Sequence, residues 1–188
     1  MIDVYVNVNR IAATASPLPA AAMSTPVFTP APLPAPADAG FAERVRASFA
    51  RQGAMGTLGA QLADVQAGRV LISLALADHV TQQHGFLHGG LLAAVLDTAC
   101  GYAASTLTPA DAGVLTVEFK INFLAPARGP VVHCEGWVAK AGRTLSVTEG
   151  RAWQDGANGQ PQLVATLNAT IMTIAGIAAD SRSTRRQP

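Results

Sequence analysis

The stretch from Gln82 to Ala104 joins a glycine-broken polar loop to an apolar segment whose only charged residue is Asp97. The loop ends in His88-Gly89-Gly90, and the apolar segment begins at Leu91. A carboxylate within an apolar helix is costly to bury unless it is paired or functional. Glycines at a helix start leave backbone N–H groups uncovered, where an anion or a polarised carbonyl oxygen can bind. These two features together predict a functional site.

The spacing of His88 and Asp97 constrains how they could act together. A separation of nine residues is about 2.5 helical turns, or roughly 13.5 Å along the axis, and places the two residues on opposite faces. The helix start and the acid of one chain therefore cannot act on the same atom. If both act on one substrate, the acid comes from a second copy of the helix lying antiparallel to the first. A two-fold homodimer supplies this arrangement and creates two shared, equivalent sites.

The composition of the 188-residue chain fits one domain with a large core. Hydrophobic residues make up 49% and charged residues only 13%, so we expect some apolar surface to be buried between subunits. The formal net charge of +1 gives no reason to expect a nucleic acid or a membrane as partner. No apolar run approaches the roughly 20 residues that span a bilayer. Cys100 and Cys134 form no disulfide framework, which predicts a reducing, cytoplasmic location.

Both ends of the chain differ from its centre. Residues 1–40 are rich in proline and alanine without sustained periodicity, so we expect a disordered tail. A secretory signal fits poorly, because Asp3 stands where positive charge is expected and Pro17 interrupts the apolar run. Residues 176–188 are polar and predict a loose tail, which leaves residues 41–175 as the folded domain.

Four elements are predicted before residue 113 from their hydrophobic periodicity. An amphipathic helix is followed by an extended segment, a strand and, after the glycine loop, the long apolar helix. Their predicted ranges are 41–52, 57–65, 69–77 and 91–107. Pro109 and Gly113 then end the helical structure.

The rest of the domain alternates between apolar and polar residues and predicts strands. In 114–124, the odd-numbered residues are apolar and fall on one face, while Thr116 falls on the other with Glu118, Lys120 and Asn122. Further strands are predicted over 131–140, 143–153 and 163–174, the first two joined by a tight turn. We expect these four strands to form an antiparallel meander. A sheet that curls around the apolar helix would be an α+β hot-dog fold.

These residues resemble the PaaI-type acyl-CoA thioesterases of the hot-dog superfamily over residues 41–175. The most specific part is His88-Gly89-Gly90, followed by Asp97 nine residues after the histidine and then by the segment TVEFKINFLAP, which runs from Thr116 to Pro126. An HGG triplet alone would be weak evidence for this family. The acid nine residues after the histidine, followed by this segment, makes the resemblance specific.

The resemblance implies catalytic roles for four residues. Asp97, from the partner subunit, would be the general base or the nucleophile. The backbone N–H of Gly90 or its neighbour would polarise the thioester carbonyl at the helix start. Thr116 would help to place the water. His88 either orients the substrate or holds the glycine turn in shape, and both roles remain open.

A further set of residues would bind the substrate. Family members often carry an asparagine six residues before the HGG histidine, where this chain has Gln82. The turn at Arg143 resembles the place where such enzymes hold the nucleotide and phosphates of coenzyme A, with positive charge from Arg143 and Lys140. The complete set of expected substrate-binding residues is Gln82, Gln83, Phe86, Gly89, Leu91, Lys140, Arg143 and Thr144.

Other chemistry suggested by single residues is weaker. His84 and His88 are four residues apart but lack an acid ligand beside them, so we expect no metal site. Cys100 lies in the apolar helix, where buried cysteines are usually structural rather than nucleophilic.

The sequence therefore predicts an acyl-CoA thioesterase acting on an aryl or medium- to long-chain acyl group. It would need no cofactor, since coenzyme A enters only as part of the substrate. The alternative is a hot-dog protein that binds acyl-CoA without hydrolysing it, and the intact Asp97 argues against this. A hydroxyacyl-CoA dehydratase would resemble a different motif, with a paired Asp and His on another loop. We expect homodimers that pair further into a homotetramer.

Overall fold

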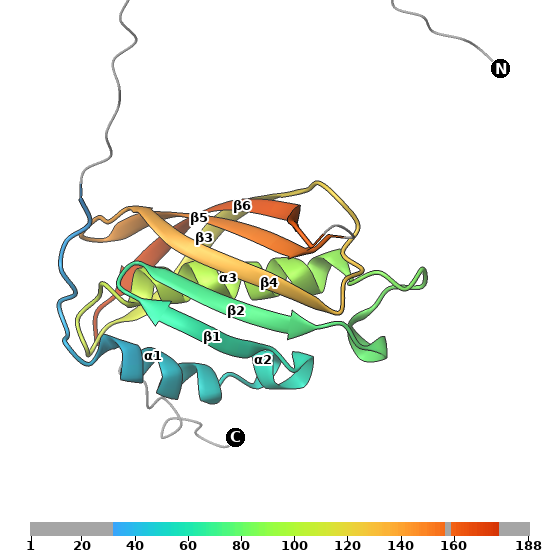
Figure 1. Ribbon diagram of the computed structural model, residues 1–188. Helices are drawn as coiled ribbons and strands as arrows, with labels where there is room; N and C mark the ends of the chain where they lie inside the picture. The colour runs from blue at the N-terminus through green and yellow to red at the C-terminus, as the bar shows by residue number, and fades with distance from the viewer. Residues whose placement is uncertain (1–31, 157–158, 177–188) are drawn as a thin grey trace, which may run out of the picture.

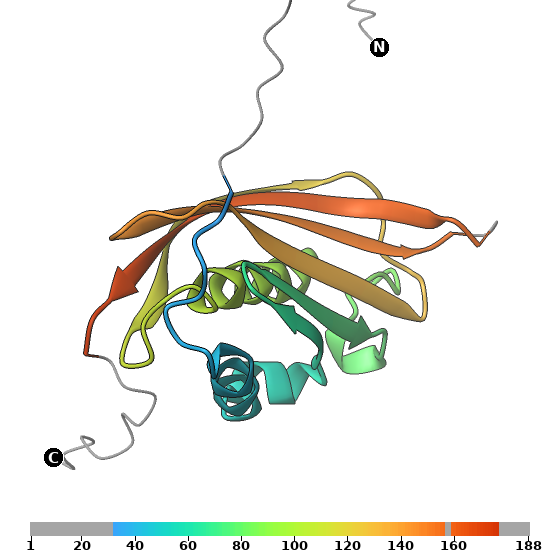
Figure 2. The same cartoon turned by 60° about the vertical axis from the view of Figure 1, so that its left-hand side comes forward.

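The structure, a computed structural model, describes residues 32–156 and 159–176. A six-stranded antiparallel sheet curves around one long helix, and two short helices lie beside its first strands (Figures 1 and 2). This arrangement confirms the predicted hot-dog fold. Of the two predicted tails, residues 1–31 of the segment 1–40 and residues 177–188 of the segment 176–188 lie outside the described residues.

The helices and strands follow the predicted order with two additions, the short helices α2 and η1. The elements are α1 (Phe41–Ala50), α2 (Gly53–Leu58), β1 (Gln61–Gln66), β2 (Arg69–Ala75), the short 3₁₀ helix η1 (Asp78–Val80), α3 (Gly89–Ser105), β3 (Gly113–Phe123), β4 (Val131–Lys140), β5 (Leu145–Asp155) and β6 (Pro161–Ile174). The prediction of extended structure from residue 57 was wrong at its start, because α2 continues to Leu58. This six-residue helix contains two glycines and is too short to show a helical hydrophobic periodicity.

The strand order in the sheet is β1-β2-β4-β5-β6-β3. β4, β5 and β6 form the predicted meander, but β3 pairs with β6 and forms an edge of the sheet. The prediction that β3 lies beside β4 was therefore wrong. Periodicity identifies a strand and its faces but carries no information about which strand it pairs with.

A β-bulge in β3 changes the face to which Thr116 belongs. Thr116 pairs with Ile171, and Glu118 pairs with the next residue of β6, Thr170, so Val117 is the extra residue. Ile171 is fully buried beneath the sheet, and its partner Thr116 shares that inner face. The prediction that Thr116 shares a face with Glu118, Lys120 and Asn122 was wrong, because strict alternation does not continue through a bulge.

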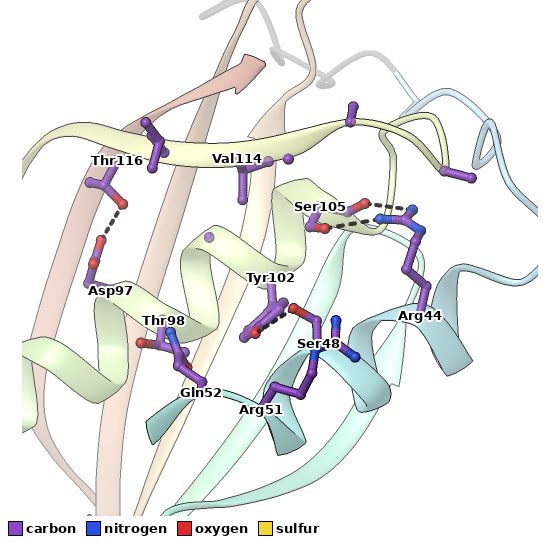
Figure 3. A pocket seen from close by; sticks show the side chains of 15 residues that line it. Arg44, Ser48, Arg51, Gln52, Asp97, Thr98, Tyr102, Ser105, Val114 and Thr116 are labelled. Carbon is purple, nitrogen blue, oxygen red and sulfur yellow. Dashed lines mark hydrogen bonds between the residues drawn. The ribbon is translucent and has the colours of Figure 1, made fainter. Parts of the chain in front are cut away.

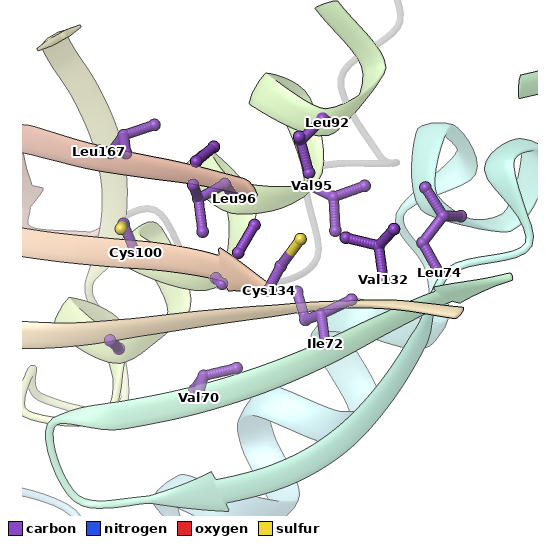
Figure 4. Close-up of a cluster of buried hydrophobic side chains, with 14 of the residues drawn as sticks. Val70, Ile72, Leu74, Leu92, Val95, Leu96, Cys100, Val132, Cys134 and Leu167 are labelled. Atoms are coloured by element: carbon purple, nitrogen blue, oxygen red, sulfur yellow. The ribbon is translucent and has the colours of Figure 1, made fainter. Parts of the chain in front are cut away.

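The core fills the space between α3 and the inner face of the sheet (Figure 4). The buried residues of α3 that contribute are Leu92, Val95, Leu96, Ala99, Cys100, Ala103 and Ala104. α3 packs very closely on Gly136 of β4, where an added Cβ would lie 2.5 Å from the carbonyl carbon of Ala99. α3 is therefore held firmly against the centre of the sheet, with its two ends and one flank left for other contacts.

Candidate active site

Asp97 lies on the flank of α3 that faces β3, and its side chain is half-buried. The Thr116 hydroxyl donates a hydrogen bond of 2.8 Å to Asp97 Oδ1 (Figure 3). Burial raises the pKa of Asp97 above its ordinary value, and the Thr116 hydrogen bond lowers it in part. The acid is thus a base of increased strength, oriented by one neighbour. This pairing depends on the bulge that brings Thr116 to the inner face.

A cleft of about 620 Å³ opens at Asp97, within the range of small-molecule sites. Its floor is α3, with Thr98 and Gly101, and one wall is the start of β3, including Val114. The opposite wall comes from α1 and the residues that follow it, with Ser48, Arg51 and Gln52 (Figure 3). Asp97 therefore lies at one side of a cleft with a markedly polar wall.

Hydrogen bonds hold this polar wall against α3. Tyr102 and Ser48 share a hydrogen bond of 3.1 Å between their hydroxyls, and the Tyr102 ring packs on Phe49. Arg44 donates to the carbonyl oxygens of Ser105 and Thr108 at the C-terminal end of α3, where a cation is favourable. The wall is thereby locked to the helix that carries Asp97.

Sequence reasoning did not identify Ser48, Arg51, Gln52 and Tyr102 as site residues. α1 is far from Asp97 in the chain, and an amphipathic helix gives no signal of which element it packs against. Only Gly101 offered a hint, since a glycine inside a helix interior is unfavourable by about 1 kcal/mol relative to alanine.

The start of α3 is capped by His88. The backbone N–H of Gly90 donates to His88 Nδ1 at 3.0 Å, which requires that the ring proton be on Nε2. The N–H groups of Leu91 and Leu92 donate to the His88 carbonyl oxygen. Among the described residues, no acceptor bonds the N–H of Gly89. The donors left for a ligand here are Gly89 N–H and His88 Nε2–H, while the Gly90 N–H is already engaged.

A second pocket, of about 380 Å³, lies at this helix start. It is lined by Gln82, Phe86, Gly89 and Phe123, among others. The Phe123 ring packs so closely on Gly89 that an added Cβ would lie 3.2 Å from it. A side chain at position 89 would therefore push against the Phe123 ring.

Two charged or polar side chains support the loop that forms this pocket. The Gln82 side-chain oxygen accepts a hydrogen bond from the His84 N–H, so Gln82 stabilises the turn. The Arg128 guanidinium lies 4.7 Å from the centre of the Phe86 ring. Arg128 is a cation near the helix start that the sequence did not single out. Gln83 is exposed and lines neither pocket, and Leu91 is half-buried on α3.

The structure does not bring all the predicted site residues together within one protomer. Asp97 and Thr116 share one pocket, whereas Gly89, Gln82 and Phe86 line the other. Gly142 and Arg143, in the turn that follows Lys140 and contains Thr144, line a third pocket beside Ala104 and Leu107 near the end of α3. The described chain therefore contains separate parts of the predicted site.

Two alternative chemistries find no support in the described part of the chain. Cys100 is buried, and burial raises the pKa of its thiol to about 12, which excludes a reactive thiolate. Across residues 32–156 and 159–176, no three His, Cys, Asp or Glu side chains gather as a metal site would require.

No helix in these ranges has the length and apolarity to cross a membrane.

Known proteins share this fold and this part of the sequence. A sequence profile of the thioesterase superfamily matches residues 84–159, which include the helix start, Asp97 and Thr116. The solved structure of a thioesterase family protein from Silicibacter pomeroyi is 47% identical in sequence, with a TM-score of 0.70. The match covers 73% of this chain and 100% of that one.

Two curated relatives add information on the family. A Saccharolobus solfataricus protein that is provisionally named an esterase is 36% identical over 93 residues, or 49% of this chain and 65% of its own length. The chain thus spans slightly less than two thirds of that relative. A 1,4-dihydroxy-2-naphthoyl-CoA hydrolase from Listeria monocytogenes is 26% identical, over 50% of this chain and 76% of that protein. With the match to the Silicibacter structure over its full length, this chain belongs to the thioesterase superfamily.

Proposed function

We propose that the protein is a PaaI-type acyl-CoA thioesterase, which hydrolyses an aryl- or medium- to long-chain acyl-CoA to the free acid and coenzyme A. The observation that carries the proposal is the half-buried Asp97, oriented by Thr116 at the side of a cleft, on the same helix whose start offers unused N–H donors. The Listeria relative acts on a CoA thioester, which supports this substrate class.

In the proposed reaction Asp97 acts as general base or nucleophile. As a base, its carboxylate takes a proton from water, and the resulting hydroxide adds to the thioester carbonyl carbon. Negative charge then develops on the carbonyl oxygen of the tetrahedral intermediate. Collapse of this intermediate breaks the carbon–sulfur bond, and the proton held by Asp97 passes to the departing thiolate. The products are a carboxylic acid and the free thiol of coenzyme A, with no other reactant consumed.

The oxyanion would be stabilised at the start of α3. Gly89 N–H is the donor favoured there, because the Gly90 N–H already donates to His88. His88 Nε2–H supplies a second donor, since the cap fixes the proton on that nitrogen. The positive end of the helix dipole adds to this stabilisation. His88 would thus both hold the glycine turn and contact the substrate.

The two halves of the site would come from two protomers. Within one helix, the donors and Asp97 are separated by roughly 13.5 Å, and they line different pockets. An antiparallel partner helix would place its Asp97 beside the first protomer's Gly89. The basic turn with Arg143 would then accompany Asp97, with Lys140 and Thr144 beside it, and would hold the phosphates of coenzyme A.

The first experiment measures thiol release from a panel of acyl-CoAs with the wild type and Asp97→Asn. Loss of the base should lower turnover by at least about 100-fold while binding persists. Tight binding without turnover in the wild type would instead identify a non-catalytic acyl-CoA binder. Equal activity of the two proteins would place the chemistry elsewhere.

A second experiment tests the shared site directly. Asp97→Asn and Gly89→Val are expected to be inactive as separate homodimers. Co-expressed in equal amounts, they form hybrid dimers with one intact site, which should restore about a quarter of the wild-type activity. If Asp97 and Gly89 acted within one protomer, co-expression would restore nothing.

A further inference from the structure

The loop between β3 and β4 is bonded to the loop that precedes α3. Residues 124–130 form no helix or strand and lie at the end of the sheet where α3 begins (Figures 1 and 2). The backbone N–H of Leu87, one residue before the cap His88, donates to the carbonyl oxygen of Ala127 at 2.9 Å. Leu87 and Ala127 are both buried. The approach to α3 is therefore set in part by one carbonyl group of the β3–β4 loop.

The side-chain amide of Gln154 holds this loop. Gln154 lies on β5 and is only 3% exposed. Its Oε1 accepts the backbone N–H groups of Arg128 and Gly129, each at 2.7 Å. Its Nε2 donates to the carbonyl oxygen of Pro126 at 3.2 Å and to Gln162 Oε1 at 2.9 Å. Because only an oxygen can accept from two N–H groups, these partners fix which way the amide points, and they use its full bonding capacity.

One peptide group joins Gln154 to Leu87. The Ala127 carbonyl and the Arg128 N–H belong to the same peptide bond, which is planar and trans, so that they point to opposite sides. On one side the N–H donates to Gln154, and on the other the carbonyl accepts from Leu87. A rotation of this peptide group would break both hydrogen bonds. Gln154 therefore fixes the direction of the carbonyl that holds Leu87.

Leu87 leads directly into the donors at the helix start. The next N–H, that of His88, donates to the carbonyl oxygen of Val80 at 2.9 Å, so the chain is anchored at two successive residues before Gly89. Of these two anchors, the one at Leu87 runs through Ala127 to Gln154. A shift of the β3–β4 loop would therefore move the entry to α3.

The same loop also reaches this region through side chains. The Arg128 guanidinium lies 4.7 Å from the centre of the Phe86 ring, next to Leu87 in the chain. Pro126 and Ala127 line the pocket at the helix start together with Gly89. Gln154 itself does not line that pocket. Its influence on the pocket would be exerted through the loop.

We propose that Gln154 is a positioning residue. Through the peptide group between Ala127 and Arg128, it holds Leu87 and thereby the Gly89 N–H and His88 Nε2–H donors in the geometry that the oxyanion requires. The inference rests on the proposed function for the role of these donors. Since donors aimed at an oxyanion act mainly in the transition state, loss of Gln154 should lower kcat and leave KM nearly unchanged.

The kinetic test uses Gln154→Met, because methionine is similar in shape and lacks the amide. With an acyl-CoA that the wild type hydrolyses, kcat should fall by at least about 30-fold and KM should change by less than about threefold. Gln154→Glu retains an oxygen for the two N–H groups and should recover at least about tenfold of the loss. A wild-type kcat for Gln154→Met, measured well below its Tm, would show a merely structural role and overturn the inference.

Gln162→Leu is the matched control. Gln162 is exposed and bonds the same amide, but its side chain makes no contact with the loop among the hydrogen bonds of the described residues. Gln162→Leu should therefore keep the kcat of the wild type. A loss equal to that of Gln154→Met would show that the effect does not pass through the loop, and would overturn the inference.

Amide hydrogen exchange followed by NMR separates this inference from the proposed function. In Gln154→Met, the Leu87 N–H should exchange at least about tenfold faster than in the wild type, while the N–H groups in the central turns of α3 keep their rates. Gln154→Glu should show a smaller acceleration, and it carries the test if Gln154→Met does not fold.

The outcomes of the two measurements are distinct. Faster exchange at Leu87 in a protein whose wild type hydrolyses no thioester would uphold the link from Gln154 to the helix start and reject the thioesterase. Unchanged exchange at Leu87, with normal hydrolysis by the wild type, would reject the role of Gln154 and leave the thioesterase intact.

Discussion

The Thr116 hydroxyl donates to Asp97 Oδ1 at 2.8 Å, joining the edge strand β3 to the central helix α3. Thr116 is also the residue that the bulge in β3 moves to the inner face. The two residues are 19 positions apart in the chain. One hydrogen bond therefore both orients the proposed base and favours its charged form.

Replacing Thr116 should change the pH dependence of catalysis. The Thr116 hydrogen bond lowers the pKa of Asp97, so Thr116→Val should raise that pKa further. The acid limb of the kcat/KM profile should then move to higher pH. Loss of the hydrogen bond that orients Asp97 should in addition lower the rate by about tenfold. Thr116→Ser keeps the hydroxyl and should keep the profile. An unchanged acid limb in Thr116→Val would show that Asp97 is not the titrating base.

Asp97 should lower the stability of the fold at neutral pH. Burial raises its pKa above the ordinary value of 3.8, so the folded state holds this proton more tightly than the unfolded state. Stability is then lost as pH rises from 3.8 through the folded pKa. Asp97→Asn should therefore raise the Tm at pH 7, and the gain should shrink near pH 3.8.

Thermal unfolding from pH 3 to 8 would check this prediction. Asp111→Asn, at an exposed acid before β3, serves as the matched control and should show no such pH-dependent gain. A Tm for Asp97→Asn that tracks the wild type at every pH would contradict the prediction.

The edge strand β3 should be a subunit contact. In the described sheet β3 pairs only with β6, and its inner-face residues Phe119 and Phe123 are 43% and 53% exposed. Exposed apolar side chains on an open edge favour association. Phe119→Asp should yield a monomer by light scattering and lower activity by at least about 100-fold through loss of the partner's acid. Phe119→Leu should remain oligomeric, and an active Phe119→Asp monomer would refute the shared site.

Gly136 should be essential for packing α3 against the sheet. A methyl group at Gly136 would collide with the backbone of Ala99 and Cys100, and helix backbone cannot move aside as a flexible side chain can. Gly136→Ala should lower the free energy of unfolding by about 1–3 kcal/mol or more. Gly56→Ala, at an open helical position, should raise it by about 0.5–1 kcal/mol. Urea denaturation measures both free energies of unfolding. A change of the same sign in the two variants would contradict the prediction.

The two candidate cations for coenzyme A can be told apart by kinetics. Arg143 lies beside the end of α3 and Arg128 beside its start. If Arg143 binds the phosphates, Arg143→Ala should raise KM for an acyl-CoA about tenfold and leave KM for the matching acyl-pantetheine, which lacks the nucleotide, close to the wild type. If Arg128→Ala gives this pattern instead, the phosphates lie at the helix start.

The sequence by itself determined the fold class and singled out the candidate catalytic residues. A long apolar helix with one acid, preceded by three residues His88-Gly89-Gly90 and followed by alternating strands, is a local pattern, and local periodicity follows from helix and strand geometry. The nine-residue spacing of His88 and Asp97 likewise means that the two residues of one helix cannot act on the same atom, because the helical rise is constant.

Only the tertiary structure decided how those residues meet. The bulge that turns Thr116 toward Asp97, the pairing of β3 with β6, and the polar wall from α1 all depend on contacts between distant segments. Strict alternation placed Thr116 on the wrong face, since one inserted residue reverses every side chain on one side of it. Sequence reasoning also did not identify Gln52 and Tyr102 as residues of the cleft. They line it because α1 packs against α3, and the sequence of a helix does not show which other element it packs against.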